Sequence, residues 1–255
     1  VEGLCVDQQA ALFGQLCLQR GDTKATFGTG CFVLANQGTD SFEITDGLLS
    51  SVGWRTLGST TYVYDGGIYT AGSLLQWLIE KVQVSSSIAD INNIIGRAQS
   101  PGEVLFIPAL GGLAAPYWIS NAAGSWTGLT ADTSREDLVY SAVESICFRV
   151  RDVVETMRST GLGIRQLQVD GGISKSPEIM RLQADILGIP VAVFDSHEAT
   201  AYGAGLFAGM ARDVWQLDGL PKPNAPARII SPSTANLQEE RYRAWRKQLN
   251  LQIGA

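Results

Sequence analysis

Histidine and cysteine are scarce in this sequence. Its 255 residues include one histidine, His197, and four cysteines, Cys5, Cys17, Cys31 and Cys147. No two cysteines stand two to four residues apart, and this spacing argues against a zinc site built from cysteine and histidine. We therefore expect four reduced, mostly buried thiols in a cytoplasmic protein.

Positive charge is also in short supply. The chain has 19 lysines and arginines against 25 aspartates and glutamates, which gives a net charge of −6 and a pI of about 4.9. Nucleic-acid binding requires a basic surface that displaces counterions, and contact with anionic membranes requires clustered basic residues. We therefore expect neither nucleic acid nor a membrane as a partner.

Long apolar runs are missing as well. No run approaches the roughly 18 residues that would cross a bilayer. The first residues, VEGLCVDQQAALFGQ, contain no basic segment of the kind that opens a signal peptide, and they lack an initiator methionine. We expect no membrane span and no signal peptide, and we expect the chain to begin partway through a longer protein.

Glycine is abundant, with 28 residues, and apolar patterns predict strands first and then alternating strands and helices. The predicted strands cover residues 23–36, as a pair joined by a glycine turn, and residues 48–54, 60–64, 104–108, 166–170 and 190–194. The predicted helices cover residues 8–18, 69–82, 87–97, 134–160, 178–187, 199–210 and 238–251. Residues 111–130 and the proline-rich residues 221–232 read as loops. This order predicts an α/β fold with a mixed sheet flanked by helices.

Two glycine turns stand where predicted strands end. Gly28-Thr29-Gly30 offers bare amides and a hydroxyl to a phosphate, but an ordinary hairpin turn would explain it as well. Asp170-Gly171-Gly172 precedes a helix, whose N-terminus favours phosphate, but it could be only a tight turn. Ligands of open α/β sheets bind at this edge. No G-x-x-x-x-G-K-[ST] sequence occurs, so a phosphate site here would be built without the lysine of a P-loop.

Two more glycine positions fall inside predicted helices. Glycine costs about 1 kcal/mol relative to alanine in a helix interior. Gly72 and the segment Gly203-Ala204-Gly205 therefore indicate close approach, either of a ligand or of another backbone. The sequence leaves both explanations open.

Charged residues on two predicted helices have simple interpretations. Asp7 stands at the start of a helix, where its carboxylate could be a general base or only a helix cap. Glu144, Arg149, Arg151 and Asp152 lie on the longest predicted helix, and we expect them on its solvated face.

Taken together and in this order, the motifs resemble those of the FGGY carbohydrate kinases, over residues 1–215. The segments that carry the resemblance are Asp7-Gln8-Gln9-Ala10-Ala11-Leu12-Phe13-Gly14-Gln15, Thr26-Phe27-Gly28-Thr29-Gly30-Cys31-Phe32, Ala71-Gly72-x-x-x-Gln76-Trp77-Leu78, Gly112-Leu113-Ala114-Ala115-Pro116-Tyr117-Trp118 and Asp170-Gly171-Gly172-Ile173-Ser174-Lys175-Ser176. The first two segments are most similar to those of the glycerol kinases within the family.

The resemblance implies a ribonuclease-H-like fold, shared with the actin, hexokinase and heat-shock ATPase group, in which two domains close over a cleft for sugar and ATP. It implies that residues 1–20 are the end of the first, substrate domain and the inter-domain connection. It implies that residues 21–255 are the nucleotide-binding domain of the FGGY C-terminal half. The N-terminal kinase domain would then be a missing partner, and a homo-oligomer stays open.

The resemblance also implies roles for particular residues. Asp7 would be the catalytic base and would help to hold Mg²⁺, and Asp7, Gln8 and Phe32 would contact the polyol. The positions implied to contact ATP or ADP are Gly28, Thr29, Gly72, Gln76, Gly171, Gly172 and Ser176.

Three positions depart from the family pattern. The loop that usually ends in an acid has Ile119, the arginine that usually follows is absent from Ala122-Ala123-Gly124, and Ser176 stands where glycerol kinases usually have asparagine. The resemblance implies phosphorylation of a polyol or sugar hydroxyl by ATP, most simply glycerol to glycerol 3-phosphate. A kinase for another sugar, such as a ketopentose, and a non-catalytic actin-like nucleotide-binding module are the alternatives.

Overall fold

The computed structural model describes residues 4–39, 42–56, 58–97, 102–194, 198–222, 225–233 and 237–254, so that His197 lies outside the described residues. The helices are α1 (Asp7–Gly14), α2 (Gly72–Glu80), α3 (Ile88–Arg97), α4 (Arg135–Ser159), α5 (Pro177–Leu187), α6 (Ala199–Ala211) and α7 (Leu237–Ile253), with short 3-10 turns η1 (Ile173–Lys175) and η2 (Leu217–Gly219). The strands are β1 (Thr23–Phe27), β2 (Cys31–Gly38), β3 (Leu49–Thr56), β4 (Ser59–Ile68), β5 (Leu105–Ile107), β6 (Ser125–Thr127), β7 (Leu167–Gly171), β8 (Val191–Val193) and β9 (Arg228–Ile230).

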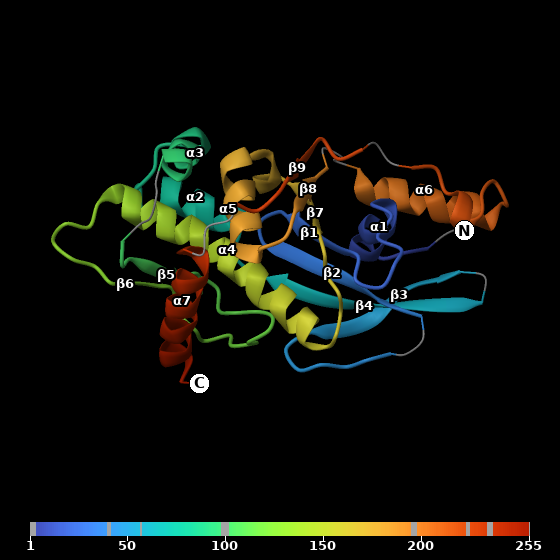
Figure 1. The fold of residues 1–255 in the computed structure, drawn as a ribbon, viewed down its shortest axis with the longest axis horizontal. Helices are drawn as coiled ribbons and strands as arrows, with labels where there is room; N and C mark the ends of the chain where they lie inside the picture. The colour runs from blue at the N-terminus through green and yellow to red at the C-terminus, as the bar shows by residue number, and fades with distance from the viewer. Residues whose placement is uncertain are drawn as a thin grey trace.

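Seven of these strands form one mixed sheet, in the order β3-β4-β2-β1-β7-β8-β9 (Figure 1). Strands β1 to β4 pair antiparallel, but β2 pairs with β4 and β3 lies at the edge, so the first four strands do not form a simple meander. Strand β7 pairs parallel with both β1 and β8. Strands β5 and β6 form a separate antiparallel pair. The predicted mixed sheet flanked by helices is confirmed.

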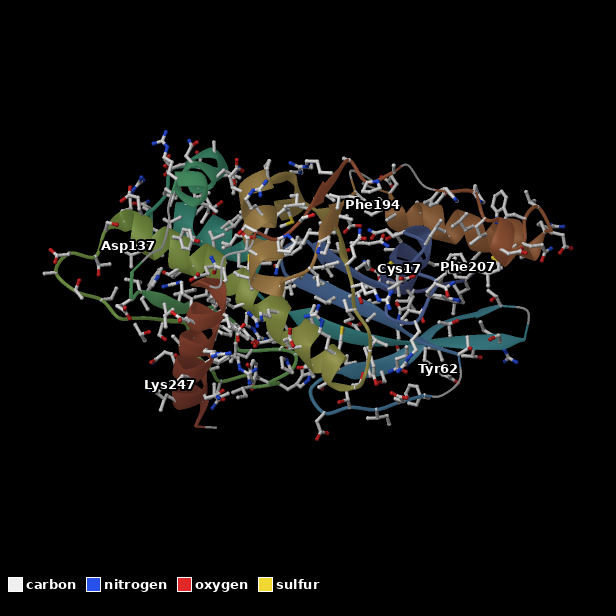
Figure 2. All side chains as sticks on the ribbon, in the orientation of Figure 1. Cys17, Tyr62, Asp137, Phe194, Phe207 and Lys247 are labelled. Carbon is white, nitrogen blue, oxygen red and sulfur yellow. The ribbon has the colours of Figure 1, made fainter. Side chains whose placement is uncertain are left out.

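The two faces of the sheet carry different layers of helices, because successive side chains of a strand point to opposite faces. Ala25, Phe27 and Val33 face a large core that contains residues of α2, α3, α4, α5 and α7. Leu34 and Val63 point the other way, into a smaller core under α1 and α6. Figure 2 labels Cys17 and Phe207, which belong to this second core.

Predicted helix ends agree with the observed capping. The hydroxyl of Ser134 accepts a hydrogen bond from the Asp137 amide at 3.2 Å, and the Asp137 carboxylate accepts one from the Ser134 amide at 2.8 Å, so a capping box opens α4 close to the predicted start at residue 134. The Ser87 hydroxyl accepts from the Asp90 amide at 3.1 Å. Pro177 is the first residue of α5, one residue before the predicted start.

Some boundaries were predicted wrongly. Helix α1 ends at Gly14 rather than at residue 18, because Leu16 takes a left-handed conformation with φ of 55° and turns the chain. Strands β6 and β9 were assigned to loops. Each has only three residues, too few for a period to appear in the sequence, and each is held by a neighbouring strand.

The cysteines are free thiols, as expected. Cys17, Cys31 and Cys147 are buried and Cys5 is half-buried. Burial raises the pKa of the Cys5 thiol to about 11 and that of the other three further still. Since the reactive form is the thiolate, these side chains act as small apolar groups. In the described part of the chain, no helix is both long and apolar enough to cross a membrane.

The charges expected on a solvated face of α4 are instead buried, and that prediction was wrong. Glu144, Arg149 and Asp152 are at most 2% exposed. Helix α7 and residues 113–118 cover this face of α4. Arg241 of α7 pairs with Glu144 at 2.6 Å, and Arg151, which is half-buried, pairs with Glu239 of α7.

Asp152 is the centre of the buried network. Its carboxylate pairs with Arg149 at 2.9 Å and accepts hydrogen bonds from the hydroxyls of Tyr117 and Tyr242 at 3.0 and 2.7 Å. Arg149 also donates to the carbonyls of Ala114 and Ala115. Burial raises the pKa of Asp152, and the Arg149 charge and the two tyrosine hydroxyls oppose that rise.

We expect Arg149→Met to destabilise the protein by about 3–5 kcal/mol, because it leaves the Asp152 carboxylate buried without its nearest cationic partner, with only Arg246 at 3.9 Å. The measurement is the change in the free energy of unfolding in urea. Arg243→Met is the matched control, since Arg243 is 75% exposed in its ion pair with Glu239 and exposed pairs contribute little. Equal destabilisation by both variants would contradict the importance of the buried pair.

The second core depends on a close approach between α1 and α6. A Cβ atom at Gly203 would lie 1.9 Å from the carbonyl oxygen of Ala10, whereas one at Gly205 would meet nothing within 4 Å. Of the two explanations for this glycine-rich segment, helix packing therefore accounts for Gly203.

Gly203→Ala should lower the free energy of unfolding by about 1–3 kcal/mol, since α1 and α6 must separate to admit the methyl group. Gly205→Ala on the same helix should be neutral or stabilising, because alanine is the better helix former. Both changes are read from urea unfolding curves. A neutral Gly203→Ala would mean that the two helices are not in fixed contact.

Candidate functional site

The turn between β1 and β2 is the centre of the site. Gly28 closes it with a hydrogen bond from its amide to the Gly30 carbonyl at 2.9 Å. Residues 71–73 bond to the same turn. The amides of Ala71 and Ser73 donate to the Thr29 carbonyl, and the Gly72 amide donates to the Gly28 carbonyl, each at 3.0 Å. The start of α2 is therefore fixed on this turn.

Gly72 has a steric reason to be glycine. A Cβ atom there would lie 2.5 Å from the Gly28 carbonyl oxygen, well inside contact distance. Of the two explanations that the sequence left open, close approach of another backbone is the one that the structure supplies. That backbone is the β1–β2 turn itself.

The second glycine turn approaches β1 from its other side. The Gly172 amide donates to the Phe27 carbonyl at 2.8 Å. Gly171 has a φ of 95°, and a Cβ atom there would lie 2.3 Å from the same carbonyl oxygen, so only glycine fits. Gly172 differs, because its φ of −64° and ψ of −46° suit any residue and its Cβ position is open.

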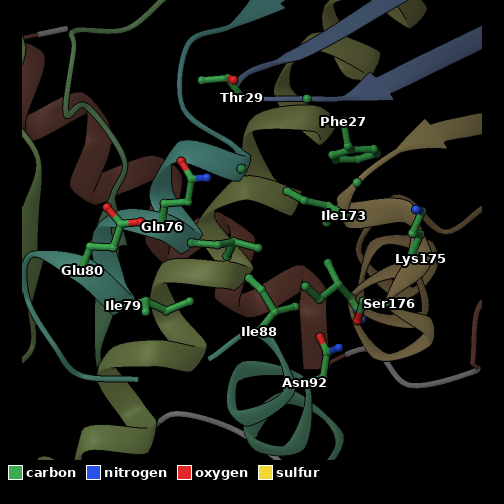
Figure 3. Close-up of a pocket in the computed structure, with 15 residues that line it drawn as sticks. Phe27, Thr29, Gln76, Ile79, Glu80, Ile88, Asn92, Ile173, Lys175 and Ser176 are labelled. Carbon is green, nitrogen blue, oxygen red and sulfur yellow. The ribbon is translucent and has the colours of Figure 1, made fainter. Parts of the chain in front are cut away.

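A cavity of about 450 Å³ opens between these segments (Figure 3). Six of the seven positions that were predicted to bind nucleotide line it: Gly28, Thr29, Gly72, Gln76, Gly172 and Ser176. Gly171 does not belong to its lining in the structure. This glycine forms the turn that brings Gly172 to the cavity.

The rest of the lining is mostly apolar. Ile79 of α2, Ile88 of α3 and Ile179 of α5 come from three helices, and Figure 3 shows Gln76 and Lys175 on opposite sides of the cavity. An apolar cavity with a few convergent polar groups is the usual form of a small-molecule site.

Sequence reasoning missed three polar residues of this cavity: Glu80, Asn92 and Lys175. Asn92 stands four residues after Ile88, so both lie on the side of α3 that lines the cavity. Its Oδ1 atom is buried and has no hydrogen-bond partner among the described residues. Lys175 follows the Gly171–Gly172 turn and adds a positive charge. Glu80 stands four residues after Gln76 and Lys175 three residues after Gly172, and this spacing from predicted site residues was the available signal. Asn92 had no such signal in the sequence.

Ser176 has a structural role as well as its position in the lining. It is the N-cap of α5, and its hydroxyl accepts a hydrogen bond from the Ile179 amide at 3.2 Å. A serine at this position is therefore compatible with both the helix start and the cavity.

Asp7 is the first residue of α1, and the N-cap is Val6. The Asp7 side chain is exposed, and its Oδ1 accepts a hydrogen bond from the Gln8 amide at 2.8 Å. The carboxylate is thus oriented by the backbone of α1 while it stays open to solvent. Asp7 is not the N-cap, although it does bond to a first-turn amide.

Gln8 and Phe32 lie with Asp7 on the other side of the sheet from the cavity. Gln8 accepts a hydrogen bond from Lys24 at 2.9 Å, and Lys24 also donates to Thr26 at 2.6 Å. Thr26 is the register partner of Phe32, whose ring is 43% exposed. Since Thr26 and Phe27 point to opposite faces of β1, the turn at residues 28–30 stands between the two groups of candidate residues.

Three charges surround this second group: Lys24 and Asp170 are buried and Asp65 is half-buried. Asp170 is 5% exposed and accepts from the Gln15 amide at 2.6 Å. Burial raises the pKa of Asp65, the Lys24 charge opposes that rise, and the Asp7 charge adds to it. Sequence reasoning assigned no function to Lys24 or Asp65, because a lone lysine or aspartate in a strand carries no motif.

The described residues contain no group of three His, Cys, Asp or Glu side chains that could hold a metal ion alone. Mg²⁺ in phosphate-transfer sites is commonly held by one or two carboxylates together with phosphates and water. An exposed carboxylate such as that of Asp7 fits this second mode.

The departure at Ile119 has a clear structural setting. Ile119 and Leu113 bridge each other through two backbone hydrogen bonds of 2.8 Å, and Ile119 packs against the main core. Arg149 holds the same loop through the carbonyls of Ala114 and Ala115. The loop is therefore closed by its own backbone and by a buried arginine of α4.

Comparisons with known proteins agree with this arrangement. The sequence model of the FGGY family of carbohydrate kinases, C-terminal domain, matches residues 23–212. A glycerol kinase of Streptococcus agalactiae serotype Ia is 40% identical over 97% of this chain and 50% of its own length. A glycerol kinase of Streptococcus pyogenes serotype M5 is also 40% identical, over 97% of this chain and 49% of its own. The chain thus spans about half the length of these relatives.

Solved structures give the same fold. The structure of Plasmodium falciparum glycerol kinase with ADP superimposes with a TM-score of 0.88 at 28% identity, over 97% of this chain and 50% of that one. A ligand-bound xylulose kinase from Lactobacillus acidophilus has a TM-score of 0.86 at 18% identity, over 96% and 50% of the two chains, which bears on the fold alone. The expected fold of the actin and hexokinase type of ATPase is confirmed.

Proposed function

Because this chain belongs to the FGGY family of carbohydrate kinases, we propose that it is the nucleotide-binding half of an enzyme that transfers phosphate from ATP to a polyol or sugar hydroxyl. The observation that carries the proposal is the convergence of Gly28, Gly72 and Gly172 from three segments on one cavity. In this proposal residues 21–255 form the nucleotide-binding domain. Residues 1–20 lead in from the substrate domain, which the N-terminal half would supply.

The cavity has the chemistry for ATP or ADP. Backbone without side chains at Gly28 and Gly172 lets phosphates come close, and Gly72 lets the start of α2 pack on the turn. The Thr29 hydroxyl and the Lys175 ammonium add a donor and a positive charge. Gln76 and Ser176 can bond to the polar parts of the nucleoside, and Gly171 maintains the turn beneath them. The isoleucine side chains offer an apolar surface to the base.

Asp7 is proposed as the general base. Phosphoryl transfer depends mainly on positioning and on neutralising charge, with one group that accepts the proton of the attacking hydroxyl. Asp7 is exposed and oriented, and Gln8 and Phe32 lie on the same side of the sheet to contact the polyol. Mg²⁺, held by Asp7 and the phosphates, would offset the charge of the transferred group.

Glycerol is the proposed substrate. Two relatives named as glycerol kinases, at 40% identity, support it over a ketopentose, while a xylulose kinase at 18% identity shares only the fold. The non-catalytic actin-like module is less well supported, because such a module has no use for a carboxylate at Asp7. Free, buried thiols are compatible with the cytoplasm as the proposed location.

Gly172→Asp should weaken binding of Mg-ADP by at least about tenfold, because it adds a negative charge beside the phosphates. The fold should tolerate it, since Gly172 has ordinary helical angles and an open Cβ position. Gly163→Asp is the charge-matched control, because Gly163 is exposed, has an open Cβ position and does not line this cavity. The measurement is calorimetric titration of both variants with Mg-ADP. Equal affinities of Gly172→Asp and Gly163→Asp for Mg-ADP would contradict the nucleotide site.

Asp7→Asn in the complete kinase should lower kcat by about 10²–10⁴-fold, the usual contribution of a general base. Mg-ADP affinity should change little. The measurement is a coupled assay of ADP release with glycerol and then with a panel of ketopentoses. A variant that keeps its kcat would rule out the base assignment and favour the non-catalytic module.

The same assay addresses the need for two halves. In the proposal this chain alone binds nucleotide but does not phosphorylate glycerol, because most polyol contacts come from the other half. Turnover of glycerol by this chain alone at the rate of the complete kinase would show that the second half is not needed.

A further inference from the structure

Lys24 is a buried charge with no role in the mechanism proposed above. It is the second residue of β1, and its side chain is fully buried, with 0% exposure. A buried ammonium is unfavourable unless it is paired and hydrogen-bonded. The surroundings of Lys24 therefore indicate what the charge does.

The ammonium is hydrogen-bonded toward the side of the sheet where Asp7 lies. Lys24 Nζ donates to Gln8 Oε1 at 2.9 Å and to Thr26 Oγ1 at 2.6 Å. Burial lowers the pKa of Lys24, and the negative charges of Asp170 and Asp65 oppose this and favour the charged form. Asp170 is itself held by Gln15.

An ammonium group has three donors and no acceptor. The atom of Gln8 that meets Lys24 must therefore be the carbonyl oxygen of its amide, which leaves Nε2, a donor, for another partner. The Thr26 hydroxyl likewise uses an oxygen lone pair toward Lys24, so its proton is free to point elsewhere. Asp7, the residue before Gln8, presents a carboxylate that accepts hydrogen bonds.

We propose that Lys24 is a positioning residue that locks the Gln8 amide so that Nε2 donates to a hydroxyl oxygen of the polyol. Asp7 and Gln8 then form an ordered acceptor–donor pair. Asp7 takes the proton of one hydroxyl, and Gln8 donates to the oxygen of a neighbouring hydroxyl. The pair selects substrates with two hydroxyl groups close together. This inference rests on the proposed function of Asp7 and Gln8.

The test is steady-state kinetics and Mg-ADP titration of the complete kinase with Lys24→Met, which keeps the apolar stem and removes the donor. The KM for glycerol should rise about tenfold, as expected for loss of one well-placed hydrogen bond. The Kd for Mg-ADP should stay within about twofold. Gln15→Met is the control, because it disturbs the same buried cluster at Asp170 without touching Gln8, and it should leave the KM for glycerol unchanged.

A double-mutant cycle separates positioning from simple stability. Once Gln8→Ala has removed the amide, adding Lys24→Met should raise the KM for glycerol no further, because the lysine acts through Gln8. A lysine that only supports the fold would give additive effects. Additive effects, or a normal KM in Lys24→Met, would overturn the inference while the proposed function stands.

Gln8→Glu tests the same idea without changing Lys24. The carboxylate still pairs with Lys24 but offers no donor to the substrate, so the KM for glycerol should rise at least about tenfold. A normal KM in Gln8→Glu would overturn the donor assignment even if Lys24→Met failed to fold. Absence of turnover by the unmodified kinase with every polyol and ketopentose would overturn the proposed function together with this inference.

Discussion

The close contact of three backbone segments at the end of β1 is the constraint on which the candidate site depends. The β1–β2 turn receives a hydrogen bond from Gly72 at the start of α2, and Phe27 at the end of β1 receives one from Gly172 of the β7–α5 turn. A Cβ atom at Gly72 would lie 2.5 Å from the Gly28 carbonyl oxygen, and one at Gly171 would lie 2.3 Å from the Phe27 carbonyl oxygen. Because these contacts leave no room for side chains, they fix the spacing between α2 and α5, and hence the width of the cavity that the two helices border.

A second constraint keeps the loop and the last helix in position. The buried carboxylates of Glu144 and Asp152 on α4 bind Arg241 and Tyr242 of α7, and Arg149 holds the carbonyls of Ala114 and Ala115. Removing either partner of such a pair leaves an uncompensated charge in the core. The long helix α4 is thus joined by polar bonds to elements that the sequence places far from it.

Successive side chains of β1 point to opposite faces of the sheet, which separates the cavity proposed for nucleotide from the residues proposed to bind the polyol. Phe27 belongs to the side with the cavity, whereas Lys24 and Thr26 belong to the side with Asp7, Gln8 and Phe32. The turn at residues 28–30 connects the two sides. In the proposed kinase a nucleotide in the cavity and a polyol beside Asp7 would meet across this turn, with Lys24 ordering the polyol side from within the sheet.

The sequence alone determined the order of the helices and of the longer strands, and the set of glycine turns, because periodicity and turn residues are local properties of the chain. It also supplied six residues that line the cavity and the resemblance to the FGGY kinases. Only the tertiary structure decided that Glu144, Arg149 and Asp152 are buried, since a charged stretch of helix looks the same in sequence whether α7 covers it or water does. The same holds for Lys24, which is significant because other elements bring Gln8 and Asp170 close to it. It also holds for Asn92, which is significant because α2 and α5 complete the cavity beside it. Burial and partnership are long-range properties, and the residues that create them stand tens of positions away in the chain.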